Sequence, residues 1–91
     1  MVENGKSCVL VAFKDRKTEL QECLDRLLPQ LSPTVHVLLV DDGSASDIRA
    51  DAAYERVIGN DFVHLIRQPS NRGVSAARNT GISWCLEHGY E

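Results

Sequence analysis

The feature that most constrains this chain is an apolar segment, residues 35–40, that leads directly into two carboxylates, Asp41 and Asp42. Its valines and leucines follow one another with almost no polar alternation, as in a strand whose two faces are both covered by helices. In parallel sheets of this kind, ligands collect beyond the carboxyl ends of the strands. Because neighbouring side chains on a strand face opposite ways, we expect the two acids to have different roles.

Strand and helix patterns alternate along the rest of the chain. The first helix is expected to begin at a capping box, Thr18 to Gln21, and to continue to about Leu31. The predicted elements are, in order, strand 7–13, helix 18–31, strand 35–40, helix 48–56, strand 62–66 and helix 74–87. This order predicts parallel strands with right-handed crossovers, so the fold class is α/β, a three-layer, parallel-sheet, Rossmann-like half-domain.

Composition narrows the classes of function. The chain has 91 residues, 43% of them hydrophobic and 25% charged, which is typical of one small globular domain or part of a larger one. A net charge of -3 argues against a nucleic-acid partner. No apolar run approaches the roughly 20 residues of a transmembrane segment, and no signal peptide is evident, so a cytoplasmic location is expected. The cysteines lack metal-ligand spacing, so we expect them to be reduced and buried.

The acidic pair has a structural and a functional interpretation. Asp41 can simply end the strand, and Asp42 can form a turn with Gly43 and Ser44. Two consecutive acids after an apolar run need a further reason, because an unpaired carboxylate at the edge of a core is costly. A carboxylate at this position accepts hydrogen bonds from a nucleobase N–H or a ribose hydroxyl, so a ligand role is predicted for at least one of the acids.

A second candidate site is the polar loop and helix start at residues 71–79. Gly73 permits a positive φ or a close backbone approach, and the helix N-terminus favours phosphate. Asn71 or Ser75 would cap the helix. Arg72 and Arg78 contact the ligand, are solvated, or hold the acidic loop; the pattern leaves these roles open. No G-x-G-x-x-G follows the first strand and no G-x-x-x-x-G-K-[ST] occurs, so a glycine-rich phosphate loop is not expected there.

Three blocks, in this order and spacing, resemble the N-terminal half of inverting, family 2 glycosyltransferases with the GT-A fold. The blocks are Val9 to Phe13, Val40 to Ser44 with Asp47, and Asn71 to Gly81, which is similar to N-x-G-x-x-x-A-R-N-x-G. The first block departs from the family, which usually has Pro-Thr-Tyr-Asn where this chain has Val11-Ala12-Phe13-Lys14. The resemblance covers nearly the whole chain.

The resemblance implies a site for a nucleoside diphosphate sugar, with a uridine diphosphate sugar favoured. It implies that Asp42 contacts the base, because a carboxylate accepts from the N3–H of uracil, and that Asp41 supports the loop. The nucleotide-binding residues implied are Val11, Ala12, Phe13, Asp41, Asp42, Gly43, Ser44, Asn71, Arg72, Gly73, Ser75 and Arg78. No catalytic residue and no metal ligand is expected among them.

The resemblance also implies what the chain lacks. The family's Asp-x-Asp motif, which holds a divalent metal (Mg or Mn) on the diphosphate, follows a fourth strand, and the general base lies further on. We therefore expect residues 1–91 to be the N-terminal nucleotide-binding portion of a glycosyltransferase domain, truncated before Asp-x-Asp, inactive alone, and derived from an enzyme of polysaccharide biosynthesis. Membrane association of that full-length enzyme is left open. The exposed sheet edge suggests a homodimer.

Two other classes share part of this pattern. A phosphoacceptor receiver domain also places acids at the end of a parallel strand, but it needs an Asp at the end of a later strand, and here the third strand ends Leu65-Ile66-Arg67. A non-enzymatic α/β interaction module is the remaining alternative, and it predicts no nucleotide affinity.

Overall fold

The computed structural model describes residues 6–90 as one sheet of three parallel strands, in the order β1-β2-β3. The strands are β1 (Ser7–Phe13), β2 (Val35–Asp41) and β3 (Val63–Arg67). The helices are α1 (Lys17–Leu27), α2 (Glu55–Ile58) and α3 (Val74–Glu87), with 3₁₀ turns η1 (Leu28–Gln30), η2 (Ile48–Ala50) and η3 (Ala52–Tyr54). The predicted α/β, Rossmann-like half-domain is confirmed. No helix within residues 6–90 is both long and apolar enough to cross a membrane.

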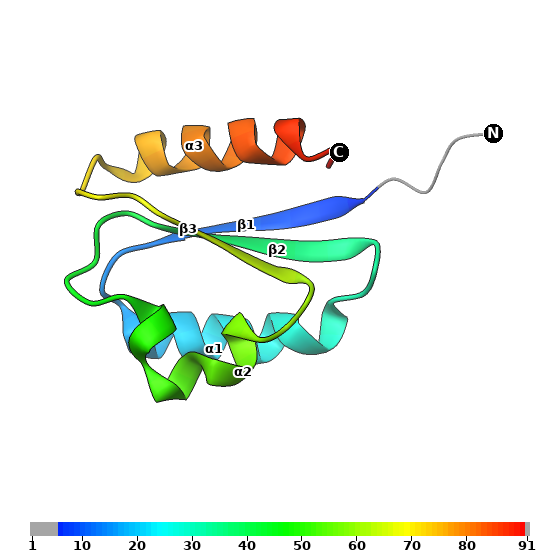
Figure 1. Ribbon diagram of the computed structural model, residues 1–91, viewed down its shortest axis with the longest axis horizontal. Coiled ribbons are helices and arrows are strands. Elements are labelled where there is room, and N and C mark those ends of the chain that lie inside the picture. The colour runs from blue at the N-terminus through cyan, green and yellow to red at the C-terminus, as the bar shows by residue number, and fades with distance from the viewer. Residues whose placement is uncertain (1–5, 91) are drawn as a thin grey trace.

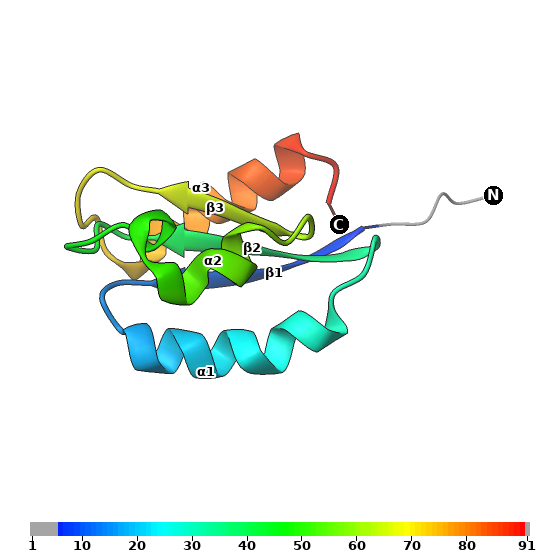
Figure 2. The same ribbon diagram turned by 60° about the horizontal axis from the view of Figure 1, so that its bottom comes forward.

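The elements form three layers with β2 at the centre of the sheet. Helix α3 covers one face, while α1 and α2 cover the other (Figure 1). The turned view agrees, with α1 and α2 in front of the sheet and α3 behind it (Figure 2). Covering both faces of a parallel sheet explains why β2 reads as an unbroken apolar run.

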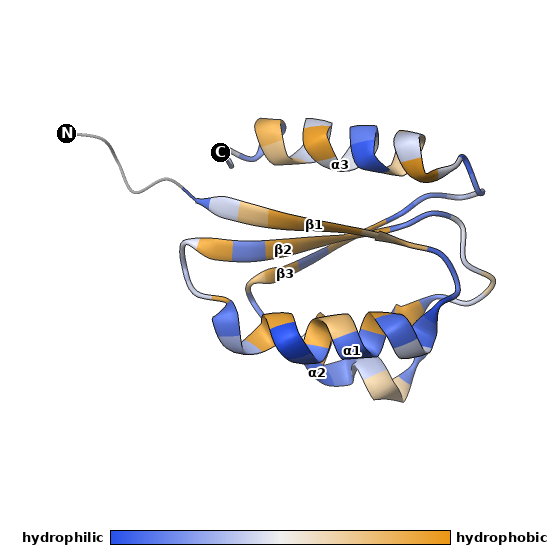
Figure 3. Ribbon diagram, turned by 180° about the vertical axis from the view of Figure 1, so that it is seen from behind, coloured by the Kyte–Doolittle hydropathy of each residue, from blue (hydrophilic) through white to orange (hydrophobic). Residues whose placement is uncertain are grey.

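Alternate residues of β2 supply the two halves of the core. Val37 and Leu39 pack on the α1 and α2 side, and Leu38 and Val40 pack on the α3 side; all four are fully buried. Figure 3 shows hydrophobic residues along the strands and hydrophilic ones in the loops at their ends. Truncating one such leucine to alanine costs about 2–5 kcal/mol, so β2 anchors both layers.

Gly81 sets the distance between α3 and the sheet. It is buried mid-helix, where glycine costs about 1 kcal/mol relative to alanine. A Cβ at this position would collide with the side chain of Leu10 on β1 and approach Val40 within 3.2 Å. Tight packing of helix on sheet therefore accounts for the glycine.

Helix α1 begins one residue earlier than predicted, and the capping box is wrong. Its N-cap is Arg16, which makes no side-chain capping bond, and its first turn contains Thr18 instead of starting from it. The N–H of Lys17 donates to the carbonyl of Asp15 at 3.0 Å, so the preceding loop sets the start. At the other end, residues 28–30 tighten into η1, which has Pro29 at its start.

The predicted helix 48–56 is also wrong, since the segment forms η2, η3 and then α2 at Glu55–Ile58. Asp47 and Asp51 interrupt a continuous helix by capping these turns. Their carboxylates accept from the N–H groups of Arg49 at 2.9 Å and of Ala53 at 3.0 Å. Such local side-chain bonds compete with the regular helical ladder.

Candidate functional site

The carboxyl ends of the three strands lie level with one another. Asp41 pairs in register with Phe13 of β1 and with Arg67 of β3. Beyond it, the N–H of Asp42 donates to the carbonyl of Phe13 at 2.9 Å, and the N–H of Gln68 donates to the carbonyl of Asp41 at 2.8 Å. The three loops that follow the strands are therefore brought together at one edge, as the topology requires.

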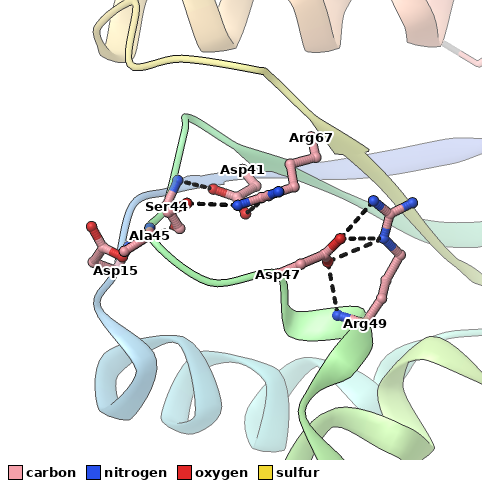
Figure 4. A network of polar contacts seen from close by, with 7 residues as sticks. All are labelled: Asp15, Asp41, Ser44, Ala45, Asp47, Arg49 and Arg67. Carbon is pink, nitrogen blue, oxygen red and sulfur yellow. Dashed lines mark hydrogen bonds and ion pairs between the residues drawn. The ribbon is translucent and has the colours of Figure 1, made fainter.

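Asp41 organises the turn that follows its own strand. It is 1% exposed, and its Oδ1 accepts from the N–H of Ser44 at 2.8 Å. Arg67 Nε lies 3.3 Å from Asp41 Oδ2, and the same guanidinium donates to the carbonyl of Ser44 at 2.7 Å (Figure 4). The arginine compensates the buried charge of Asp41. Both oxygens of this carboxylate therefore bond to groups of the protein itself.

Asp42 joins the β2 loop to the β3–α3 loop. It is 5% exposed, and its two oxygens accept from the backbone N–H groups of Arg72 at 2.9 Å and of Gly73 at 3.0 Å. Gly43 adopts φ +80°, and a Cβ there would lie 2.5 Å from the backbone nitrogen of Asn71. The two loops therefore pack backbone against backbone, which only glycine permits at this point.

Asp42 also lines a cleft of about 650 Å³ at this edge of the sheet. One wall is the loop after β1, and the opposite wall is the start of α3. The lining residues are Ala12, Phe13, Lys14, Asp15, Arg16, Asp42, Asn71, Gly73, Val74 and Ala77. The cleft thus combines carboxylates, a helix N-terminus and basic side chains, a set that suits a ligand with both hydrogen-bond donors and negative charge.

The N-terminus of α3 points its first turn at this cleft without a side-chain cap. Its N-cap is Gly73, with φ 92°, and not Asn71 or Ser75 as predicted. Asn71 instead accepts from the N–H of Gly73 at 3.0 Å through its own side chain. The first N–H groups of a helix lack intrahelical partners, so this end favours an anion.

The cleft contains five of the residues predicted from the sequence and omits seven. Ala12, Phe13, Asp42, Asn71 and Gly73 line it. Asp41 and Ser44 are buried beneath it, and Ser75 and Arg78 are exposed on α3. The remaining three, outside the lining, are Val11, Gly43 and Arg72.

Sequence reasoning missed the charged loop after β1 and the partner of Asp41. Lys14, Asp15 and Arg16 line the cleft, yet they read only as a polar loop. The sequence pattern identified Arg67 only as the end of the third strand. The register of β2 with β3, which sets Arg67 beside Asp41, is the signal that would have found that pair.

Asp47, another acid of the loop after β2, does not line the cleft. Asp47 lies apart from Asp41 and pairs with Arg49, with 2.7 Å between its Oδ2 and Arg49 Nη2 (Figure 4). Hydrogen bonds from the Arg49 side chain, and then from its backbone, lower the pKa of Asp47 to about 2. The pair is on the surface, so it contributes little to stability.

Fold and cleft together define an α/β, Rossmann-like half-domain with a ligand site at the carboxyl ends of its strands. A family model described as glycosyl transferase family 2 matches residues 8–87. The chain therefore belongs to glycosyl transferase family 2, and its sheet is the start of a GT-A fold.

Individual relatives agree with this family. The chain is 40% identical over 58 residues to the polyprenol monophosphomannose synthase of Mycolicibacterium smegmatis, covering 64% of this chain and 22% of that protein. It is 35% identical over 81 residues to the putative glycosyltransferase EpsH of Bacillus subtilis, covering 89% of this chain and 23% of that protein. It is 31% identical over 83 residues to the glycosyltransferase GlyA of Streptococcus pneumoniae, covering 91% of this chain and 12% of that protein. The chain thus spans less than a quarter of the length of these relatives.

Proposed function

We propose that this chain is the nucleotide-recognition part of an inverting glycosyltransferase that uses a nucleoside diphosphate sugar and transfers the sugar to a saccharide or other hydroxyl acceptor. The observation that carries the proposal is the cleft in which Asp42, the loop after β1 and the N-terminus of α3 meet. Its position at the carboxyl ends of parallel strands is where α/β folds bind nucleotides.

The chemistry of Asp42 fits a base with a ring N–H, and uracil is such a base. An ionised carboxylate has about four lone-pair sites, and the backbone of the β3–α3 loop occupies only two of them. The remaining lone pairs accept from a ring N–H such as N3–H of uracil. A carboxylate that is already oriented by two backbone N–H groups presents these lone pairs in a fixed direction, which supports base discrimination.

The positive groups of the cleft favour the diphosphate. The uncapped start of α3 faces the cleft, and Lys14 and Arg16 lie on the opposite wall. Helix N-termini and basic side chains both attract phosphate oxygens. In this arrangement the chain binds and orients the donor.

A divalent metal belongs to the proposed reaction, but the residues described here do not fit it. Among residues 6–90 no group of three or more His, Cys, Asp or Glu side chains could hold a metal ion. We assign Mg or Mn, the general base and the acceptor site to residues outside this chain. We propose that residues 1–91 alone transfer no sugar. We also propose a cytoplasmic location, a role in polysaccharide biosynthesis and pairing of two copies through the exposed sheet edge.

The proposal is tested by amide NMR titration of the chain with uridine, guanosine and thymidine diphosphates, each with and without Mg. Saturable shifts with uridine diphosphate are expected at residues 12–16, Asp42 and 71–74, and they should not depend on Mg. A well-dispersed spectrum that responds to none of the three nucleotides would overturn the proposal. A response to guanosine or thymidine diphosphate alone would overturn only the choice of base.

A further inference from the structure

Asp15, in the loop after β1, is the non-glycine residue with a positive φ among residues 6–90. Its φ is 59°, in the left-handed region that residues with a Cβ adopt at a cost. Such a conformation persists only where the surrounding structure holds it, and it is enriched at ligand sites. Asp15 also lines the cleft, so its strain lies where a ligand would bind.

Two hydrogen bonds across the cleft edge hold this conformation. The N–H of Asp15 donates to the Oγ of Ser44 at 2.8 Å, and the Oδ1 of Asp15 accepts from the N–H of Ala45 at 2.8 Å. Figure 4 shows Asp15 beside Ala45 at the tip of the β2 loop. We call these two bonds the Asp15 latch. Lys14 Nζ, 3.6 Å from Asp15 Oδ2, leaves Oδ1 to Ala45.

The latch joins the first loop to loops that are already fixed. Ser44, its partner, is buried and held by Asp41 and Arg67. Asp42, two residues before Ser44, holds the β3–α3 loop through two backbone N–H groups. With the latch closed, the loops after β1, β2 and β3 form one connected rim around the cleft.

We propose that Asp15 is a positioning residue for the donor nucleotide, and this inference rests on the proposed function. The latch sets the backbone of residues 13–16 against the Ser44 turn before any ligand arrives. A wall that is already ordered costs less entropy on binding. Opening the latch therefore weakens nucleotide binding, although Asp15 itself need not contact the nucleotide.

The test compares substitutions at one position. Asp15→Ala removes the carboxylate and disfavours the left-handed backbone, Asp15→Gly removes the carboxylate but relieves the backbone strain, and Asp15→Asn keeps an acceptor oxygen and tolerates this φ. Asp47→Ala is the matched control, because Asp47 is an acid of the β2 loop bonded to Arg49 and lies outside the cleft lining. Dissociation constants for the three nucleoside diphosphates are measured at a temperature where each variant is fully folded.

We expect Asp15→Ala and Asp15→Gly to weaken binding about tenfold, and Asp15→Asn and Asp47→Ala to stay within about twofold of the wild type. Amide hydrogen exchange at Ala45, without ligand, should become faster in the Ala and Gly variants alone. A purely structural role would lower the melting temperature without changing affinity in the folded protein.

Two contrary results have different meanings. If the wild type binds a nucleotide and Asp15→Gly binds it equally well, the Asp15 carboxylate has no positioning role and the inference is overturned while the proposed function stands. If the wild type binds none of the three nucleotides, the proposed function fails, and the role of the latch in binding fails with it. Exchange at Ala45 would then still show whether Asp15 fixes the loop.

Discussion

The two ends of the sheet are stabilised by different kinds of hydrogen bond. At the carboxyl end, carboxylates accept hydrogen bonds from backbone N–H groups, whereas at the amino end side chains bond to other side chains. Asp42 accepts from two backbone N–H groups, and Asp41 accepts from one and pairs with Arg67. At the opposite end, His36 Nδ1 lies 2.7 Å from Tyr90 Oη and 3.0 Å from His64 Nε2. One end fixes loops with carboxylates and an arginine, and the other fixes a segment with aromatic and histidine rings.

The amino-end cluster closes the sheet where α3 returns to it. His36 Nε2 lies 3.1 Å from the carbonyl of Pro33 and donates to it, so its Nδ1 accepts from the phenol of Tyr90. Tyr90 follows α3, and the bridge between Lys6 and Tyr90 brings it beside the start of β1. Phe62 stacks on His36, with 5.2 Å between ring centroids. Within residues 6–90, the rings of this cluster contact one another by stacking and by hydrogen bonds.

The two ends differ in which hydrogen-bonding groups remain available to a ligand. Bonds from carboxylate to backbone leave lone pairs and helix N–H groups facing a cleft. At the amino end, Tyr90 Oη and the bonded nitrogens of His36 and His64 are engaged with one another. The carboxyl end can therefore recognise a ligand, while the amino end contributes mainly stability, and the predictions below test this contrast.

The largest effect is expected where the two carboxyl-end loops touch. Gly43→Ala places a Cβ 2.5 Å from the nitrogen of Asn71 and 2.6 Å from the carbonyl carbon of Ser70, at φ +80°. We expect a loss of about 3 kcal/mol or more in the free energy of unfolding, because the backbone cannot retreat without breaking the Asp42 bonds. Urea denaturation at unchanged m-value measures it.

Gly73→Ala is the matched control for this substitution. Gly73 has φ +92°, but a Cβ there would have no heavy atom within 4 Å. Only the backbone conformation is penalised, because φ +92° with ψ 161° is a region essentially restricted to glycine, at a cost of about 1–3 kcal/mol. Equal losses for the two variants would show that the contact between the loops contributes nothing beyond the backbone conformation.

The second effect tests whether Asp42 acts through both oxygens. Asp42→Asn keeps the shape but turns a donor toward one of the two backbone N–H groups, so we expect a loss of about 2 kcal/mol and weaker nucleotide binding. Asp47→Asn, at an exposed N-cap, should cost about 0.5 kcal/mol or less. Indistinguishable unfolding curves for the two variants would mean that the Asp42 bonds are not needed for the loop.

The sequence predicted the parts of the fold that follow from the order of apolar and polar residues along the chain. The apolar run of β2 and the acids after it predicted a doubly covered strand with polar chemistry at its end, because burial on both faces leaves no other pattern. The prediction of a positive φ at Gly73 followed from what only glycine can do.

The parts that were wrong depend on contacts between distant segments. The capping box at Thr18 is a sound local signal, but the loop tied by Asp15 to Ala45, 30 positions away, sets where α1 begins. Arg67 compensates Asp41 across 26 positions, which depends on strand register. A single sequence contains no local mark of either pairing, so Asp15 and Arg67 were missed.

The smallest effect belongs to the amino end, and it should depend on pH. Burial, then the neighbouring His36, His88 and Lys6, lower the pKa of His64 below 6.5. A histidine with a lowered pKa in the folded state stabilises the fold when neutral. Its contribution is therefore complete above about pH 6.5 and is lost as the pH falls through the folded pKa.

His64→Gln separates this contribution from the rest of the acid response. Glutamine keeps a donor for Tyr90 Oη, which lies 3.0 Å from His64 Nε2, but it does not titrate. Urea midpoints of both proteins should fall from pH 7 to pH 5, and the wild type should fall more steeply, by less than the losses expected at Gly43 and Asp42. Parallel curves would mean that the amino end holds its rings without regard to their charge. A steeper slope in the wild type that leaves nucleotide affinity unchanged would confirm that the two ends act separately.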